Sequence, residues 1–309
     1  MPRIKTALPR KNDRMKKLLI VGIVLVSLVL VYTAVNITGK SHIVTRHESV
    51  VSEKIASPVR LLLLSDLHCC TFGENNERLK EAIDAASPDL ILLGGDIIHR
   101  SGDWADTVAF IGRIAERYPC FYVTGNHEVS RGEAGEIKNA LRQEGVVTIG
   151  GKCEPITVGE TTFALSGIDE YRRKVFLPFE KRDEELDEEE YDAYALETLR
   201  KRLCEVQPDD AGLYSVVLIH RPEEYETVFS YGFDLMLSGH AHGGQVIIPG
   251  ILNGLYAPSQ GLFPKVAGGL FSFDSHVLNV GRGLSKKPWY AARVFNPPEL
   301  VTIDLMPAD

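Results

Sequence analysis

The stretch LLLLSDLH, residues 61–68, decides the fold of this chain. Its run of leucines is typical of a buried strand, and polar residues begin where the run ends. We therefore expect Asp66 and His68 at the carboxyl end of that strand. In α/β sheets, ligands bind in the crevice outside the carboxyl ends of the strands. The stretch thus predicts an α/β protein with a polar site at one edge of its sheet.

Four further motifs repeat this arrangement of an apolar run followed by polar residues. They are GGD at 94–96, GNHE at 125–128, IHR at 219–221 and GHAH at 239–242. Side chains alternate along a strand with a period of two. We therefore expect Asp66 and His68 to point the same way, and His240 and His242 to form a second pair of this kind.

The residue types in these motifs fit one chemistry better than any other. Imidazole and carboxylate ligands suit Mn, Fe, Zn or Ni. Two such ions about 3.5–4 Å apart can clamp an in-line displacement at phosphorus while a metal-activated water attacks. Two ions also need a shared ligand, which a carboxylate can supply. The motifs therefore predict a phosphoesterase with two divalent metal ions as cofactors, and they leave the identity of the metal open.

The ordered set D-x-H, GGD, GNHE, H and GHAH resembles that of the calcineurin-like metallophosphoesterase superfamily. The resemblance covers most of the chain after Val59. Within the superfamily the chain resembles in particular the membrane-anchored bacterial phosphohydrolases of the YkuE/YaeI type. That narrower resemblance is carried by the dipeptide GQ at 244–245 and by the segment 254–300.

The resemblance also implies a role for each motif residue. It implies that one ion is surrounded by Asp66, His68, Asp96 and His242. Asp96 would bridge to a second ion, which would also be held by Asn126, His220 and His240. His127 would be the catalytic histidine that binds no metal and protonates the leaving oxygen.

One position departs from the pattern of the superfamily. Its phosphoprotein phosphatases often carry GDxxDR, in which the second Asp orients the catalytic histidine. Here residues 95–100 read GDIIHR, so His99 stands in that place. The departure weakens a protein-phosphatase interpretation, and it leaves open which group orients His127.

Each motif residue also has a purely structural interpretation. A single histidine near a strand end is more often hydrogen-bonded within the protein than bound to a metal, and an aspartate at a turn is usually a cap. For the whole ordered set, that interpretation would need repeated coincidence. His47, His99 and His276 match no motif, and we interpret them as structural or solvated.

The N-terminal region predicts a membrane anchor. Residues 18–37 read LLIVGIVLVSLVLVYTAVNI, without a charge, and at about 1.5 Å per residue they can cross a hydrocarbon core of about 30 Å. Several bases and a single acid precede them, so the positive-inside rule places the catalytic domain outside the cytoplasmic membrane. A cleaved signal peptide is the alternative, but no small-x-small site follows the run.

The composition indicates a folded enzyme without a nucleic-acid partner. Hydrophobic residues make up 44% of the 309 residues. The net charge is −8 although the first residues are basic, which argues against a broad basic surface. The five cysteines show neither a zinc-knuckle spacing nor a disulfide framework, and we interpret Cys69 and Cys70 as buried structural thiols. No obligate protein partner is evident.

Between the motifs, strand-like and helix-like segments alternate. Residues 74–86 and 104–118 have helical periodicity and end before Pro88 and Pro119. Alternation predicts crossover connections between packed layers of sheet and helix. By resemblance the fold is the four-layer α/β/β/α sandwich, preceded by one transmembrane helix. We expect a basic cytoplasmic tail (1–17), the anchor (18–37), a linker (38–57) and a catalytic domain (58–309).

Two other segments stand out. The acidic segment 181–205 is either a lid or docking helix or, in the interpretation we prefer, a solvated insertion. Near the C-terminus, bases and aromatics are mixed among glycines. Bases near two metals could hold a second phosphate, and the apolar side chains beside them could receive an acyl chain. Arg282 is the candidate substrate contact there, and ordinary closing loops are the alternative.

The sequence leaves three functions open. The first is a phosphohydrolase acting on a phosphodiester or pyrophosphate bond of a small-molecule or lipid-linked substrate of the cell envelope. The second is a broad phosphomonoesterase. The third is a membrane-tethered binding protein with a structural dimetal site, although a scaffold has no need of an acid such as His127 beside its ligands.

Overall fold

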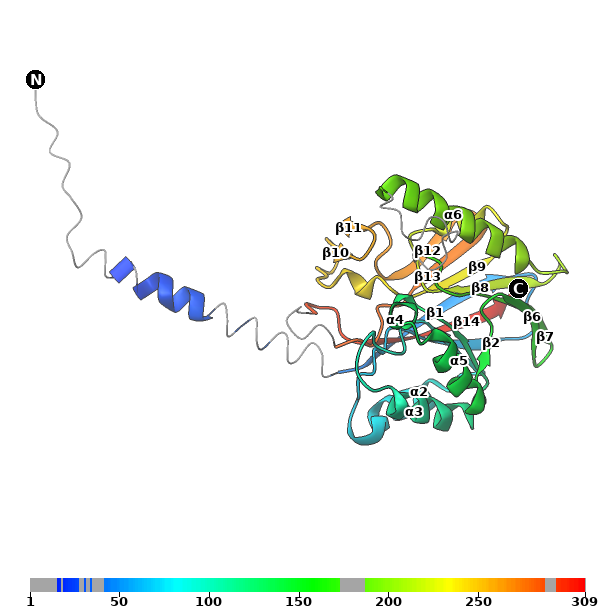
Figure 1. Ribbon diagram of the computed structural model, residues 1–309, viewed down its shortest axis with the longest axis horizontal. Coiled ribbons are helices and arrows are strands. Elements are labelled where there is room, and N and C mark those ends of the chain that lie inside the picture. The colour runs from blue at the N-terminus through cyan, green and yellow to red at the C-terminus, as the bar shows by residue number, and fades with distance from the viewer. Residues whose placement is uncertain are drawn as a thin grey trace, which may run out of the picture.

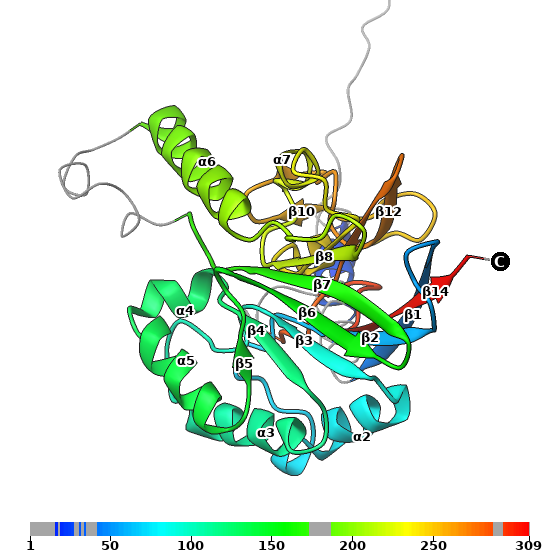
Figure 2. The same ribbon diagram turned by 90° about the vertical axis from the view of Figure 1, so that its right-hand side faces the viewer.

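Two six-stranded sheets pack face to face in the computed structural model, with helices on the outer face of each (Figure 1). The layers therefore follow the order helix, sheet, sheet, helix, as Figure 2 shows. The structure describes residues 16–17, 19–27, 31, 34, 42–172, 187–286 and 293–308.

The first sheet presents three of the motifs at one edge. Its strand order is β1-β14-β2-β3-β4-β5. The strands are β1 (Val44–Ser52), β14 (Glu299–Pro307), β2 (Val59–Leu64), β3 (Leu90–Gly94), β4 (Cys120–Val123) and β5 (Val147–Thr148). Neighbours are parallel except β14 and β2, which are antiparallel. Because β2, β3 and β4 are parallel, the loops that follow them leave the sheet at the same edge.

The second sheet presents the other two motifs. Its order is β12-β13-β9-β8-β7-β6. The strands are β12 (Gly269–Phe273), β13 (His276–Val280), β9 (Leu235–Ser238), β8 (Tyr214–Ile219), β7 (Thr161–Ile168) and β6 (Lys152–Val158). Only the outer pairs β12–β13 and β6–β7 are antiparallel. IHR therefore follows β8 and GHAH follows β9 at one edge. A separate two-stranded ribbon joins β10 (Tyr256–Ala257) and β11 (Gly261–Leu262).

The helices cover the outer faces of both sheets. The first sheet is covered by α2 (Glu77–Ala86), α3 (Ala105–Ala115) and α5 (Ala134–Gln143), and the second by α6 (Glu188–Glu205) and α7 (Tyr225–Phe229). Short helices occupy three loops: η1 (Glu74–Asn76), α4 (Asn126–Arg131) and η4 (His242–Gly244). The loops that carry GNHE and GHAH thus end in helical turns.

The leucine run shows why the central strands are apolar on both faces. Leu61 and Leu63 point into the core between the two sheets. Leu62 and Leu64 point into the core beneath the helices of the first sheet. A strand that is buried on both faces needs a continuous apolar run rather than an alternating one. The predicted α/β fold class is confirmed, and the structure shows that both sheets are mixed.

The expected linker 38–57 contains a strand of the sheet. Within that range β1 pairs with β14 over its whole length, from Val44 with Glu299 to Ser52 with Pro307. We expected a linker because residues 38–57 are polar and lack periodicity. An edge strand needs only its backbone groups for pairing, so its side chains carry a weak signal.

Part of the acidic segment 181–205 forms α6, and residues 181–186 lie outside the described residues. Asp187 caps the start of this helix, because its carboxylate accepts a hydrogen bond from the amide of Glu190 (2.9 Å). The side chains that α6 buries are Ala195, Leu199 and Leu203. The segment is therefore a covering helix of the second sheet along most of its length.

The prediction of a single-pass membrane anchor at 18–37 was wrong. Among the described residues, no helix is long and apolar enough to cross a membrane. The predicted basic tail lies outside the described residues except for residues 16–17.

Candidate metal centre

The loops that follow β2 and β3 hold each other through backbone hydrogen bonds. The amide of Asp66 donates to the carbonyl of Gly95 (3.0 Å), and the amide of His68 donates to the carbonyl of Asp96 (2.9 Å). These bonds continue the pairing of β2 with β3 beyond the strands. They bring the D-x-H and GGD motifs side by side.

Two groups of ligand-type side chains meet at this edge. One consists of Asp66, His68 and His242, and the other of Asp96, His220 and His240. Within each group the candidate ligand atoms lie within 4.8 Å of one another. Each group combines residues from both sheets. All six were predicted from the sequence as metal ligands.

Asp96 lies between the two groups. Its Oδ2 is 3.6 Å from Nε2 of His68 in the first group and 3.3 Å from Nε2 of His220 in its own. Its Oδ1 accepts a hydrogen bond from the backbone amide of His127 (2.7 Å). Asp66 is held similarly, because the amide of His240 donates to its carboxylate (3.1 Å). Each carboxylate is therefore fixed by the backbone of a different motif.

The candidate ligands converge through left-handed turns and not through strand alternation. The backbone φ angle is positive at Asp66 (53°), His68 (50°), Asp96 (51°), His240 (67°) and His242 (49°). We expected Asp66 to align with His68, and His240 with His242, because the members of each pair lie two apart on a strand. However, β2 ends at Leu64 and β9 at Ser238, before these residues. Left-handed backbone at residues other than glycine costs about 1 kcal/mol or more and concentrates at functional sites. The left-handed turns thus orient these side chains toward one another.

Two glycines leave room for the carboxylates. A Cβ on Gly125 would lie 2.3 Å from Oδ1 of Asp96, and a Cβ on Gly239 would lie 2.4 Å from Oδ2 of Asp66. Real Cβ atoms do not approach this closely. The first residues of GNHE and GHAH are therefore glycine for steric reasons.

Asp96 and His220 shift each other's pKa in opposite directions. Burial alone would raise the pKa of Asp96, but the nearby imidazole of His220 lowers it well below its usual range. Burial opposes a charge on His220 as well, yet Asp96 raises the pKa of His220 to about 10. The Nδ1–H of His220 donates to the carbonyl of Gly94 (2.8 Å), which turns Nε2 toward Asp96.

The donor set fits divalent metal ions. Among the described residues, both ring nitrogens of His68 and Nε2 of His220 are buried without a hydrogen-bond partner. Burial lowers the pKa of His68 and of His240 well below the usual value, so their lone pairs are free of protons near neutral pH. Buried lone pairs such as those of His68, beside two carboxylates, are what cations would satisfy.

Asn126 and His127 begin α4 next to Asp96. The ring of His127 lies with its Nε2 3.9 Å from Oδ2 of Asp96. Its Nδ1 accepts a hydrogen bond from the backbone amide of Arg100 (3.2 Å). A backbone donor therefore orients this ring, which the sequence had left open. Burial lowers the pKa of His127 to about 4, so the ring is neutral and carries its proton on Nε2.

Glu128 is a buried carboxylate to which the sequence alone assigned no role. It accepts hydrogen bonds from the amides of Asp96 (3.1 Å), Ile98 (2.9 Å) and Gly125 (2.9 Å). Burial and the charge of Asp96 raise its pKa to about 8, and the amide of Ile98 opposes this shift. Glu128 thus ties the GGD loop to the GNHE loop.

His99 also lies at the site, although we interpreted it as structural or solvated. Its ring centroid is 5.0 Å from that of His127 and 5.6 Å from that of His68. The three histidines form a further group whose nitrogens lie within 4.8 Å of one another. The sequence did contain a signal that His99 lies at the site, because in GDIIHR it stands where phosphoprotein phosphatases carry an aspartate that orients the catalytic histidine. His47 and His276 bond instead to Thr302 and to the carbonyl of Phe233.

Arg282 is paired with a carboxylate. Its Nη1 lies 3.6 Å from Oε2 of Glu299, and its side chain packs across Gly268. A different arginine, Arg221, lies with its Nη1 3.2 Å from Nε2 of His240. Arg221 also donates to both carboxylate oxygens of Glu170 (3.0 Å). Arg221 is therefore a base that the structure places against a candidate ligand.

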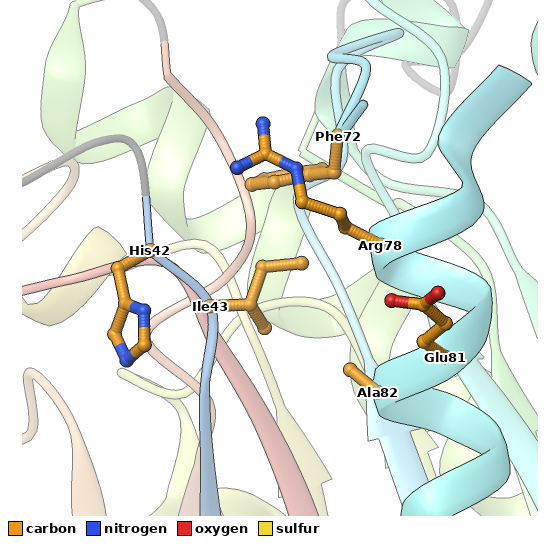
Figure 3. A pocket seen from close by; sticks show the side chains of 6 residues that line it. All are labelled: His42, Ile43, Phe72, Arg78, Glu81 and Ala82. Carbon is orange, nitrogen blue, oxygen red and sulfur yellow. The ribbon is translucent and has the colours of Figure 1, made fainter. Parts of the chain in front are cut away.

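A hollow of about 190 Å³ lies away from these groups, between the start of β1 and α2 (Figure 3). Ile43, Phe72 and Ala82 form its apolar part, and Arg78 and Glu81 reach it from α2. Its lining includes none of the predicted site residues. Its mixed lining has no feature that selects one ligand class.

Comparisons with known proteins agree with this geometry. Residues 59–244 match the family model Calcineurin-like phosphoesterase. The chain is 26% identical over 269 residues to Phosphodiesterase YaeI of Escherichia coli (strain K12), covering 84% of this chain and 87% of that protein. It is 37% identical over 93 residues to the UDP-2,3-diacylglucosamine pyrophosphatase LpxG of Chlamydia muridarum, covering 28% of each. The resemblance found in the sequence is confirmed.

Proposed function

This chain belongs to the calcineurin-like phosphoesterase family, and we propose that it is a hydrolase that cleaves phosphodiester or pyrophosphate bonds with two divalent metal ions. Membership makes it a metal-dependent phosphoesterase. The bond type is proposed from the relatives, one named a phosphodiesterase and one a pyrophosphatase. The ions, which we propose are Mn, Fe, Zn or Ni, would activate a water and neutralise charge at phosphorus.

The observation that carries the proposal is the position of Asp96 between two groups of ligand-type side chains. We assign one ion to Asp66, His68 and His242 and the other to His220, His240 and Asn126, with Asp96 shared. His127 would hold its Nε2 proton toward the leaving oxygen. The backbone amide of Arg100 supports this role, because it accounts for the position of the proton.

We propose a lipid-linked or cell-envelope phosphate compound as the substrate. Support comes from LpxG, whose name states a diacylated nucleotide sugar as its substrate. Arg282 stays a candidate contact for a second phosphate, although Glu299 holds it in this structure. A phosphomonoesterase or a binding protein with structural metals is the alternative. The presence of His127 beside the ligands disfavours the binding protein.

The test compares the purified chain with Asp96→Ala on paired chromogenic diester and monoester substrates, with metal content measured in parallel. We expect the wild type to hold two metals and to prefer the diester. The variant should lose activity and most of its metal, because two cations would then face each other without a shared anion. Full metal occupancy with near-normal turnover in the variant would refute the assignment of Asp96.

A further inference from the structure

Six large apolar side chains are exposed on two neighbouring segments that follow the GHAH motif. We call them the apolar rim: Ile248, Ile251, Tyr256, Leu262, Phe263 and Phe295. Exposure reaches 83% at Ile251, 66% at Leu262 and Phe263, and 69% at Phe295. Figure 1 shows β10 and β11, which carry Tyr256 and Leu262, projecting from the left side of the molecule. Exposed apolar clusters of this kind mark binding surfaces.

The apolar rim is continuous with the loop that carries the candidate ligands His240 and His242. The side chain of Asn296, next to Phe295, donates to the carbonyl of His242 (2.8 Å). The amide of Leu255, next to Tyr256, donates to the carbonyl of Gly244 (2.9 Å). Both segments of the rim are therefore fastened to the GHAH loop itself.

The ribbon of the apolar rim also meets the second group of ligands. Ser259, in the turn between β10 and β11, accepts a hydrogen bond from Nη1 of Arg221 (2.8 Å). The same nitrogen lies 3.2 Å from Nε2 of His240. One guanidinium thus links the base of the ribbon to the candidate metal centre.

Two phenylalanines of the apolar rim have an unfavourable backbone conformation. The φ angle is 57° at Phe263 and 49° at Phe295. Bulky side chains rarely adopt this left-handed region, and strain of this kind is retained where function uses it. Simple exposure of two aromatic residues would not require it.

The charge around the apolar rim is opposite to that of the whole chain. Residues 246–273 contain Lys265 and no acidic residue, whereas the chain carries a net charge of −8. A low-charge, slightly basic surface suits an amphiphile with an anionic head and an apolar tail. It does not suit a free hydrophilic nucleotide, which would leave the rim in water.

We propose that the apolar rim binds the hydrocarbon chain of an anionic amphiphilic substrate while its phosphate reaches the metal centre. This inference rests on the proposed phosphohydrolase function and assigns the residues that select the substrate. The metal centre would treat short and long esters alike. The rim would favour the long ones, since each methylene removed from water strengthens binding by about fourfold.

The experiment compares methyl and octyl 4-nitrophenyl phosphate, both below micelle-forming concentrations. We expect kcat/KM of the wild type to be higher for the octyl ester by about tenfold or more. In the triple variant Leu262→Ser, Phe263→Ser and Phe295→Ser this preference should fall to about twofold or less, with the methyl ester unaffected. Phe263→Ser alone should give an intermediate ratio.

Val51→Ser is the matched control. Val51 is 62% exposed, lies in β1 and is not part of the apolar rim. This variant should keep the preference of the wild type. A wild-type ratio near one, or the same ratio in wild type and triple variant, would overturn the proposal. If the triple variant does not fold, the ratio of kcat/KM for the two esters is compared between Phe263→Ser and Val51→Ser instead.

Direct binding separates this inference from the proposed function. If neither ester is hydrolysed by metal-loaded protein, the phosphohydrolase proposal fails, and calorimetric titration with octyl phosphate against methyl phosphate still tests the rim. Equal affinity for both would overturn the rim proposal. So would wild-type protein that sediments with phosphatidylcholine–phosphatidylglycerol vesicles, or dimerises through the rim, without preferring octyl phosphate.

Discussion

At the scale of single residues, the carboxylate of Asp96 divides its two oxygens between different tasks. Oδ1 is taken by the amide of His127 (2.7 Å), and Oδ2 faces the imidazoles of His68 and His220. The backbone amide of His127 thus positions the carboxylate of Asp96, while the side chain of His127 remains available for a role in catalysis. This separation makes the role of the His127 side chain testable without loss of the site.

Our first prediction at this scale is that His127→Ala keeps both metals. The amide that holds Asp96 remains in the variant. We expect kcat to fall by about 10²–10⁴-fold on alkyl esters, whose leaving oxygen needs a proton, and to fall much less on nitrophenyl esters. Steady-state kinetics on both ester classes, with metal analysis, makes the measurement.

His240→Ala is the control for that prediction, since it removes a candidate ligand. It should lose metal and fail equally on both ester classes. If His127→Ala is depleted of metal, or if its defect is independent of the leaving group, His127 is not the proton donor.

The second prediction concerns the proton on His220. Asp96 raises the pKa of His220 to about 10 in the metal-free protein, so the ring is protonated at neutral pH. A metal needs the lone pair of Nε2, so binding must displace this proton. The apparent affinity should therefore rise by about tenfold per pH unit below pH 10. Calorimetry in buffers of different ionisation enthalpy should show about one proton released, and no buffer dependence would contradict the prediction.

At the scale of elements, the site is built from loops that reverse direction immediately after a strand. Each loop is held by backbone hydrogen bonds to another loop, as between Asp66 and Gly95. The buried side chain of Glu128 adds two more bonds between loops, from the amides of Asp96 and Ile98, and a third within its own loop, from the amide of Gly125. Close approach of loops leaves no space for side chains at certain glycines.

We predict that Gly239→Ala lowers both metal content and stability. The new methyl group would lie 2.4 Å from Oδ2 of Asp66 and 2.6 Å from Oγ of Ser65, so one of them must move. Overpacking of this kind costs about 1–3 kcal/mol. Urea unfolding of the metal-free protein measures the cost separately from metal loss.

Gly135→Ala is the matched control. Apart from its chain neighbours and the backbone of its own helix, no atom of the described residues lies within 4 Å of the added methyl group, and Gly135 belongs to α5. A helical Gly→Ala change should leave the free energy of unfolding unchanged or raise it by up to about 1 kcal/mol. Equal effects of the two substitutions would contradict the steric argument.

At the scale of the whole molecule, the candidate metal centre joins the two sheets. Asp66 and Asp96 follow strands of the first sheet, and His220 and His240 follow strands of the second. Ions held by both sets would act as cross-links across the core between the sheets. Metal binding should therefore stabilise the whole fold and not one loop.

We predict that chelation lowers the thermal unfolding midpoint of the full chain. At metal concentrations about 1,000 times the dissociation constant, binding contributes about 4 kcal/mol, which shifts the midpoint by about 8–15 °C. Calorimetric scans with and without chelator make the measurement. Asp96→Ala should show little shift, and a wild type that is insensitive to chelation would contradict the cross-link.

The sequence by itself determined the family, the fold class and the order in which the site motifs follow one another along the chain. A run such as that of residues 61–64 is a local signal, because burial on both faces of a strand requires only apolar side chains. A polar motif directly after it is equally local. Asp66, His68, Asp96 and His220 are therefore identifiable from the order of residues alone.

Tertiary structure decided what depends on packing between distant segments. The left-handed turn at Asp66, the amide of Arg100 on His127 and the proximity of His99 all arise where loops from different strands meet. The pairing of β1 with β14 joins chain segments about 250 residues apart, and no local pattern encodes it. The exposure of the apolar rim was not readable from the sequence for a related reason: residues such as Phe263 and Phe295 have the same identity in a core or on a surface, and only the assembled loops show that they are exposed.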